Sequence, residues 1–157
     1  PANLGWKDIP LATELDTLNL DFSVGVLSNP VMVNVGNPHA VFFVEDVGNI
    51  PLEYLGPEIE THKIFPERTN VEVAQILPDN SIRLRVWERG VGITQACGTG
   101  ACATLVAASR RNLTSRTANV ILDGGILAIE WRDDNHVIMT GPVSSVFTGI
   151  INKSLVI

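Results

Sequence analysis

Long apolar segments and blocks of basic residues are both missing from this 157-residue chain. No apolar run approaches the ~18 residues that a membrane span requires, which argues against a membrane protein. Lys and Arg number 11 against 17 Asp and Glu, and the formal net charge is −6. Because nucleic-acid affinity is built from clustered Lys and Arg, a nucleic-acid partner is not expected either. The composition therefore predicts a soluble globular protein that binds small molecules or other proteins.

Cysteine is scarce, and the two that occur are Cys97 and Cys102. Both fall on one expected helix, where a rise of ~1.5 Å per residue separates them by about 7.5 Å along the axis. That separation exceeds the usual disulfide limit of about 7 Å, so we expect two free thiols. Free thiols suit a reducing compartment, which predicts a cytoplasmic protein.

Short β-rich runs bounded by turn residues make up most of the chain. In residues 82–87 the apolar Ile82, Leu84 and Val86 alternate with Arg83, Arg85 and Trp87, as in a half-buried strand. Short connections between the last four runs favour antiparallel hairpins. The expected strands cover residues 31–35, 40–44, 71–77, 82–87, 120–122, 126–131, 137–140 and 146–151.

Two helices are expected beside these strands. Residues 52–63 are typical of a surface helix, interrupted at Gly56 and Pro57. Residues 99–111 have no polar stripe, and a helix that is apolar all round is normally buried on all sides. The predicted fold class is α+β, with a mostly antiparallel, curled, barrel-like sheet around one central buried helix.

The residues just before the buried helix favour a reactive thiol. Residues 96–100 read A-C-G-T-G; the two glycines allow a tight turn, and the unpaired N–H groups of the first helical turn suit a carboxylate. Thiols at helix starts have pKa values of roughly 3.5–7.5, against about 8.5 for a free thiol. Cys97 therefore fits proton removal next to a carboxylate, as in amino-acid racemisation, while a small core residue in a Gly-rich cap fits about equally well. Cys102, inside the apolar helix, is expected to be an inert core residue.

Four blocks of residues resemble the diaminopimelate epimerase family and occur in its order and spacing. They read G-N-P-H-A at 36–40, R-T-N-V-E at 68–72, R-V-W-E-R-G at 85–90 and A-C-G-T-G-A-C-A at 96–103. The resemblance covers nearly the whole chain and corresponds to the family's C-terminal half. It implies a pyridoxal-independent isomerase, with no cofactor and no metal, that interconverts LL- and meso-diaminopimelate in lysine and peptidoglycan precursor synthesis.

The resemblance also implies roles for eight residues. The family's site lies between two similar domains, each of which offers one cysteine at a helix start, so Cys97 would be one member of an acid/base pair. Gly98 and Thr99 would bind the reacting carboxylate of the substrate through backbone N–H groups, and Glu88 would meet the α-ammonium group. Asn37, Asn70 and Arg89 would hold the distal end of the substrate. His39 would lie behind these residues, near the thiols.

Two departures from the family are visible. Ile93 stands in the loop before Cys97, where many members have Glu. No residues correspond to the N-terminal domain that supplies the second cysteine. We therefore expect residues 1–157 to form a single C-terminal domain whose partners are the missing N-terminal domain and a small-molecule substrate, and which is inactive alone.

Two alternatives stay open at this point. A related two-cysteine racemase acting on proline or hydroxyproline shares the C-G-T-G turn, although residues 87–90 and the blocks around Asn37 and Asn70 disfavour it. A non-catalytic binding or structural domain with the same fold is the other. Thiol alkylation separates the classes, because a catalytic Cys97 should react before Cys102 at neutral pH. A homodimer also stays open.

Overall fold

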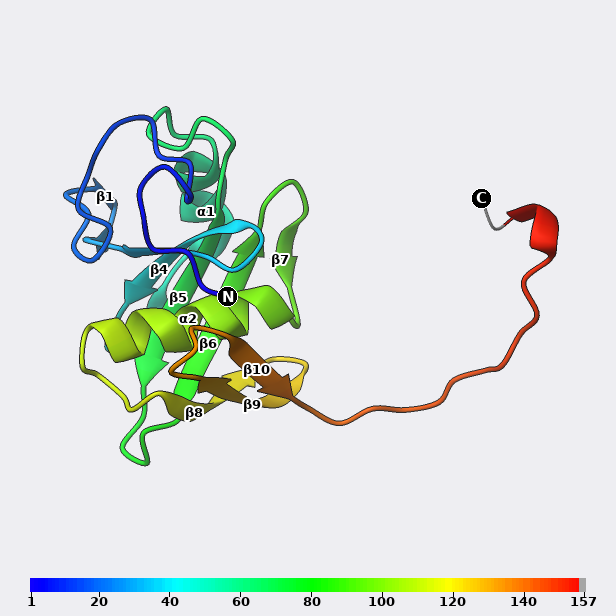
Figure 1. The fold of residues 1–157 in the computed structure, drawn as a ribbon. Helices are drawn as coiled ribbons and strands as arrows, with labels where there is room; N and C mark the ends of the chain where they lie inside the picture. Colours follow the sequence, from blue (N-terminus) through cyan, green and yellow to red (C-terminus); the bar gives the residue numbers. More distant parts are fainter. Residues whose placement is uncertain (156–157) are drawn as a thin grey trace.

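A computed structural model describes residues 1–155 of the chain (Figure 1). Most of them form one body of strands around a central helix, and the last described residues run away from it. In chain order the elements are β1 Ser23–Val24, β2 Leu27–Ser28, β3 Val31–Asn34, β4 Pro38–Phe43, η1 Val47–Asn49, α1 Leu52–Glu60, β5 Asn70–Ile76, β6 Ile82–Glu88, β7 Gly92–Thr94, α2 Gly98–Arg110, β8 Thr117–Leu122, β9 Gly125–Trp131, β10 Val137–Thr140 and η2 Lys153–Leu155.

One curled sheet carries most of the strands, in the order β10-β9-β8-β6-β5-β4-β3, with β7 paired to β6. Hairpins join β8 to β9 and β9 to β10, as expected. The β4–β5 and β6–β8 pairs are parallel, and a helix lies in each connection because a tight hairpin cannot join parallel strands. The predicted α+β class, with a mostly antiparallel sheet curled around one buried helix, is confirmed.

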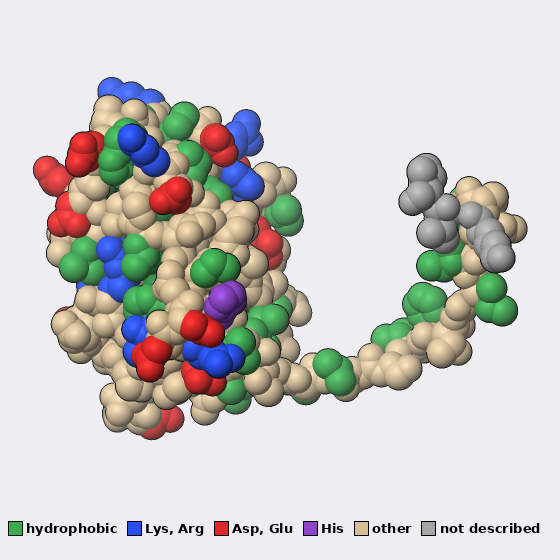
Figure 2. Space-filling view, in the orientation of Figure 1, with side chains coloured by type: hydrophobic (Ala, Val, Ile, Leu, Met, Phe, Trp, Pro, Cys, Tyr) green, Lys and Arg blue, Asp and Glu red, His purple; other side chains and the backbone are tan. Residues whose placement is uncertain are grey.

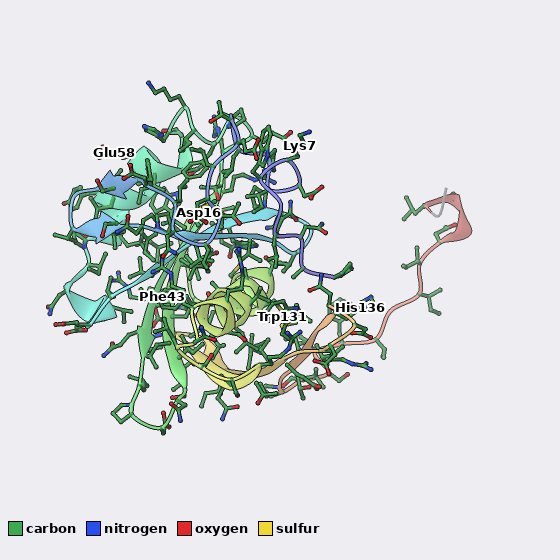
Figure 3. All side chains as sticks on the ribbon, turned by 60° about the vertical axis from the view of Figure 1, so that its left-hand side comes forward. Lys7, Asp16, Phe43, Glu58, Trp131 and His136 are labelled. Carbon is green, nitrogen blue, oxygen red and sulfur yellow. The ribbon has the colours of Figure 1, made fainter. Side chains whose placement is uncertain are left out.

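Helix α2 occupies the hollow of this sheet and contacts β3 to β6 and β8 to β10. Phe43 and Trp131, which both pack against the same core, lie on opposite sides of the helix (Figure 3). Residues Ala103 to Ala108 are buried without a break, and Leu105 is 0% exposed. The absence of a polar stripe thus correctly predicted a helix enclosed on nearly all sides.

A second core lies on the opposite face of β3 to β5. Phe42, Val71 and Val73 pack there against Leu52 and Ile59 of α1. The segment before β1 contributes Ile9, Leu11 and Leu20 to the same core. Side chains alternate along a strand, so β4 and β5 send every second residue toward α1 and the others toward α2. Burial on both faces explains why β4 reads as a continuous apolar run from Ala40 to Phe43.

Helix α1 is continuous through Gly56 and Pro57, so the predicted interruption is wrong. Gly56 lies against the indole of Trp87, where a Cβ atom would come within 2.5 Å of the ring. The glycine is therefore needed for close packing on β6 and not for a break in the helix. The helix also ends at Glu60, earlier than expected, and one of its faces is buried.

The strand expected at 146–151 is absent, and this prediction is also wrong. Residues 141–150 have no secondary structure and run away from the body of the protein (Figure 1). Val146, Phe147 and Ile150 are exposed, and Figure 2 shows apolar side chains along this segment. A strand forms by pairing with a neighbour, and this segment has none. None of the helices in residues 1–155 has both the length and the apolar character needed to cross a membrane.

Candidate active site

Cys97 is the N-cap of α2. Its backbone is extended, with φ −138° and ψ 106°, and its Sγ atom accepts a hydrogen bond from the Gly100 N–H at 3.3 Å. The Thr99 hydroxyl lies 3.5 Å from the same sulfur. A side chain at this position normally satisfies one of the free N–H groups of the first helical turn, and here a thiol does so.

The start of α2 opens onto a cavity of about 430 Å³. Four of the residues predicted for the site line it: Cys97, Gly98, Thr99 and Glu88. The other lining residues are Pro1, Val35, Ala96, Cys102, Val137 and Met139. The cavity therefore combines a thiol, the first residues of a helix and a carboxylate with an apolar wall.

A hollow of similar volume, about 440 Å³, lies on the outside of β8 to β10, near Ser81, Asn119 and Thr140. Its lining contains no cysteine and no histidine. Of these two hollows, the Cys97 cavity is the one that brings together thiols and a half-buried carboxylate, groups that can carry protons in acid/base chemistry.

Six of the lining residues were not predicted for the site, and two of them, Cys102 and Met139, carry sulfur atoms. Cys102 packs against the core, as expected, but it is only half-buried and also lines the cavity. Met139, from β10, approaches the start of α2, where its Sδ atom lies 3.1 Å from the position of a Cβ atom on Gly98. A helix that is apolar all round does not indicate which side meets a cavity, and only the sheet topology brings β10 beside Gly98.

Three neighbouring strands present a titratable side chain toward α2: His39 from β4, Glu72 from β5 and Glu88 from β6. Their strand neighbours two residues away, such as Val41 and Val86, belong to the core around α2, which fixes the face on which all three lie. Glu88 accepts a hydrogen bond from the Thr94 hydroxyl at 2.5 Å through Oε1. The alternation along β6 thus brings Glu88 to the cavity.

His39 and Glu72 form a buried pair, and neither side chain is exposed. The Nδ1 atom of His39 lies 2.6 Å from Glu72 Oε1, and its Nε2 atom lies 2.9 Å from Asn37 Oδ1. Asn37 and His39 do not line the Cys97 cavity. Sequence reasoning did not single out Glu72; the available signal was a carboxylate at an inward position of an apolar strand.

Asn70 and Arg89 form another pair beside the cavity, outside its lining. The Asn70 side chain accepts the Arg89 backbone N–H at 2.9 Å and donates to the Pro38 carbonyl at 2.8 Å. The Arg89 guanidinium donates to the Glu67 carbonyl at 2.9 Å. The three residues predicted to hold the distal end of the substrate therefore lie at the ends of β4, β5 and β6, next to the cavity that holds Cys97. They are Asn37, Asn70 and Arg89.

A buried carboxylate on α1 holds the turn that carries Glu88 and Arg89. Glu60 accepts the Trp87 indole N–H at 2.7 Å and the Gly90 backbone N–H at 2.9 Å. It is 5% exposed. Nothing in the sequence indicated this link, because a charged residue at the end of a helix is usually a solvated one.

Burial raises the pKa of the Cys97 thiol above its ordinary value. Hydrogen bonds from Thr99 and the Gly100 N–H lower it in part, and the Glu72 and Glu88 carboxylates raise it further. The lowered pKa expected from the helix start is therefore wrong, since loss of hydration outweighs the favourable dipoles. Burial and the neighbouring Cys97 raise the pKa of Cys102 to about 11. Both thiols are free, as expected.

A curled sheet around one buried helix, with a thiol at the start of that helix, defines a domain of the amino-acid epimerase fold. A crystal structure of a hydroxyproline epimerase from Agrobacterium vitis shares it, with a TM-score of 0.53 and 17% identity over 73% of this chain and 41% of that one. At this identity the likeness shows the fold alone. The family model "Diaminopimelate epimerase" matches residues 31–146, and the chain belongs to that family.

Relatives named diaminopimelate epimerase agree with this membership. The protein from Rhodospirillum centenum is 56% identical over 99% of this chain and 53% of its own length. Those from Erythrobacter litoralis and Acidiphilium cryptum are 56% and 51% identical over 92% and 97% of this chain. The chain spans about half the length of these curated relatives. The family resemblance found in the sequence is thus confirmed.

Proposed function

We propose that this chain carries one half of a diaminopimelate epimerase site, which interconverts LL- and meso-diaminopimelate in lysine biosynthesis in the cytoplasm, without pyridoxal. The observation that carries the proposal is the Cys97 thiol at the start of α2, in one cavity with Glu88. The names of relatives that are 51–56% identical support the substrate. Residues 1–157 would act as the C-terminal domain of the enzyme.

The start of α2 would bind the reacting carboxylate. The N–H groups of Gly98 and Thr99 belong to the first helical turn, where no carbonyl of the helix can reach them. They lie at the positive end of the helix dipole, which favours an anion. With the carboxylate there, Glu88 lies in the same cavity and would bind the α-ammonium group.

Cys97 would serve one face of the α-carbon. Its raised pKa keeps the proton on sulfur near neutral pH, so the free site would hold Cys97 as the acid. A base on the other face removes the α-proton and leaves a carbanion, and Cys97 donates its own proton to the opposite face and becomes a thiolate. The reverse reaction starts from the Cys97 thiolate and exchanges the two roles.

The second face of the substrate's α-carbon would need a thiol from outside this chain. Cys102 lies on the same helix as Cys97, and a thiol with a pKa of about 11 is a poor proton carrier at neutral pH. The curated relatives are about twice as long as the stretch they share with this chain. We therefore propose that an N-terminal half supplies the base, and that a homodimer of this chain is not sufficient.

Complementation tests this function. The chain is incubated with LL-diaminopimelate in D₂O, alone and with the N-terminal half of the Rhodospirillum centenum relative, and α-deuteration and meso product are followed. We expect meso product only with both halves, and none when Cys97→Ala replaces the wild type; Cys102→Ala is the matched control and should retain activity. Meso product from this chain alone would overturn the two-face argument. Failure of both halves together to act on diaminopimelate would overturn the assignment.

A further inference from the structure

Glu72 is a carboxylate in the middle of the core that the proposed reaction does not use. It lies on β5 between Val41 of β4 and Val86 of β6, and it is 0% exposed. Its neighbours Val71 and Val73 pack toward α1, so the alternation along β5 directs Glu72 toward α2. In the described part of the chain its one titratable side-chain partner is His39. A carboxylate in such a place is costly, because burial removes its hydration.

Gly100 allows this carboxylate to approach the start of α2. A Cβ atom on Gly100 would lie 3.0 Å from Glu72 Oε1 and 3.2 Å from Cys97 Sγ. The buried carboxylate and the proposed proton carrier therefore meet around one glycine. The second oxygen of Glu72, Oε2, is buried and has no hydrogen-bond partner among residues 1–155.

The first oxygen begins a chain of hydrogen bonds that ends at the surface of the site. Glu72 Oε1 contacts His39 Nδ1 at 2.6 Å, and His39 Nε2 contacts Asn37 Oδ1 at 2.9 Å. An amide oxygen can only accept, so Nε2 carries a proton. The contact between Nδ1 and Glu72 then needs a proton of its own, held by Glu72 or by the ring. Burial, which raises the pKa of Glu72, favours the carboxyl form that donates it.

The far end of the chain is the Asn37 amide. Because its oxygen accepts from His39, its NH₂ group points away from the ring, and it has no hydrogen-bond partner among the described side chains. Asn37 is half-buried, so this donor is open to a ligand. If the His39 proton moved to Nδ1, the amide would turn over and offer its oxygen, which repels a carboxylate.

We propose that Glu72 is a positioning residue: it keeps the His39 proton on Nε2 and so holds the Asn37 amide with its NH₂ group toward a carboxylate of the ligand. The proposal rests on the proposed function for the identity of that ligand. The proton position on His39 and the orientation of Asn37 do not depend on catalysis. They can be measured on the chain as it is.

Nuclear magnetic resonance of the ¹⁵N-labelled chain tests this directly. Long-range ¹H–¹⁵N correlations show which ring nitrogen of His39 carries the proton at neutral pH. We expect Nε2 in the wild type and in Glu72→Gln, whose amide can donate to Nδ1. In Glu72→Met, which has a similar volume and no donor, the ring should populate both tautomers. A wild-type ring protonated only on Nδ1 would overturn the proposal, as would an Nε2 tautomer that Glu72→Met leaves unchanged.

Thr104→Val is the matched control. It removes the other buried side-chain oxygen that has no partner in residues 1–155, with no link to His39, and should leave the tautomer unchanged. The wild-type spectrum alone can overturn the proposal, so the proposal stays testable even if Glu72→Met does not fold. Adding meso-diaminopimelate should then shift the Asn37 NH₂ signals of the wild type and not those of Glu72→Met. A wild type that binds no diaminopimelate counts against the proposed function and leaves the tautomer result standing.

Discussion

The Sγ atom of Cys97 and the backbone N–H of Gly100 share a 3.3 Å hydrogen bond, so a thiol caps the buried helix of this protein. A thiol is a weak acceptor and a thiolate is a strong one. When Cys97 gives up its proton, the same contact would become stronger and offset part of the cost of a buried charge. The helix start therefore lowers the energy of the form that appears during proton transfer, although burial raises the resting pKa of Cys97.

Substituting Gly100→Ala should destabilise the protein even though Ala is the better helix former by about 1 kcal/mol. The new Cβ atom would lie 3.0 Å from Glu72 Oε1 and 3.2 Å from Cys97 Sγ, and both neighbours are held in the core. We expect a loss of about 1–3 kcal/mol in the free energy of unfolding, measured in urea. Gly98→Ala is the control, because its Cβ atom meets only the flexible end of Met139. A more stable Gly100→Ala protein would contradict this packing.

Much of the fold follows from local pattern. The buried helix was predicted within one residue at each end because its composition leaves no polar side. The interruption of α1 was wrong because Gly56 reads as a helix breaker, whereas its missing side chain makes room for Trp87, a contact that only the tertiary structure creates. Residues 146–151 have the composition of a strand, but a strand also needs a partner, which composition cannot show.

The site was predicted less completely than the fold. The motif blocks located Cys97 and Glu88, which line one cavity. Glu72 escaped attention because a glutamate is usually a surface residue, and its pairing with His39 depends on the parallel register of β4 and β5. The pKa direction of Cys97 was missed for a similar reason: a helix start is visible in the sequence, while the depth of burial that opposes it is not.

The two cysteines should differ in their rates of alkylation. The thiolate is the reacting form, and the pKa of Cys102 is raised to about 11. Cys97 should therefore react first with iodoacetamide at neutral pH, and Cys102 should approach its rate only in strong base. Removing the hydroxyl in Thr99→Val should shift the Cys97 profile to higher pH, because the bond from Thr99 lowers its pKa. Peptide mass spectrometry resolves the two sites; faster labelling of Cys102 would refute the assignment.

Stability should depend on pH through Glu72. Burial raises the pKa of Glu72 above its ordinary value of 4.5, although His39 opposes the shift. A group whose pKa is higher in the folded chain stabilises the fold fully below its unfolded value, and that contribution is lost as the pH rises through the folded pKa. Between pH 4.5 and the folded pKa, wild-type stability should therefore fall relative to Glu72→Met. Parallel curves from urea unfolding at a series of pH values would contradict this.

Shortening a leucine side chain in the central helix α2 should cost much more stability than shortening one in the C-terminal segment. Leu105 is 0% exposed, whereas Leu155 is 76% exposed. Leu105→Ala leaves a cavity in the core, and we expect a loss of about 2–5 kcal/mol in the free energy of unfolding. Leu155→Ala is the matched control and should change it by about 0.5 kcal/mol or less. Equal effects in urea unfolding would show that α2 is not the centre of the core.

Loss of the Glu60 carboxylate should loosen the turn that presents Glu88 to the cavity. Glu60→Ala leaves the Trp87 indole N–H and the Gly90 backbone N–H without their acceptor. Trp87 is half-buried and Gly90 is exposed, so each lost hydrogen bond should cost about 0.5–1.5 kcal/mol. The variant should therefore unfold earlier in urea, and its Gly90 amide should exchange faster with D₂O. Arg68→Ala is the control, because Arg68 is largely exposed and pairs with Glu60 at 3.4 Å; it should cost about 1 kcal/mol or less. If Gly90 exchanged at the wild-type rate in Glu60→Ala, another contact would have to hold this turn. We expect Glu60→Ala to leave the alkylation rates of Cys97 and Cys102 unchanged. A change confined to Gly90 would then show that Glu60 acts on the Glu88 side of the cavity and not on α2.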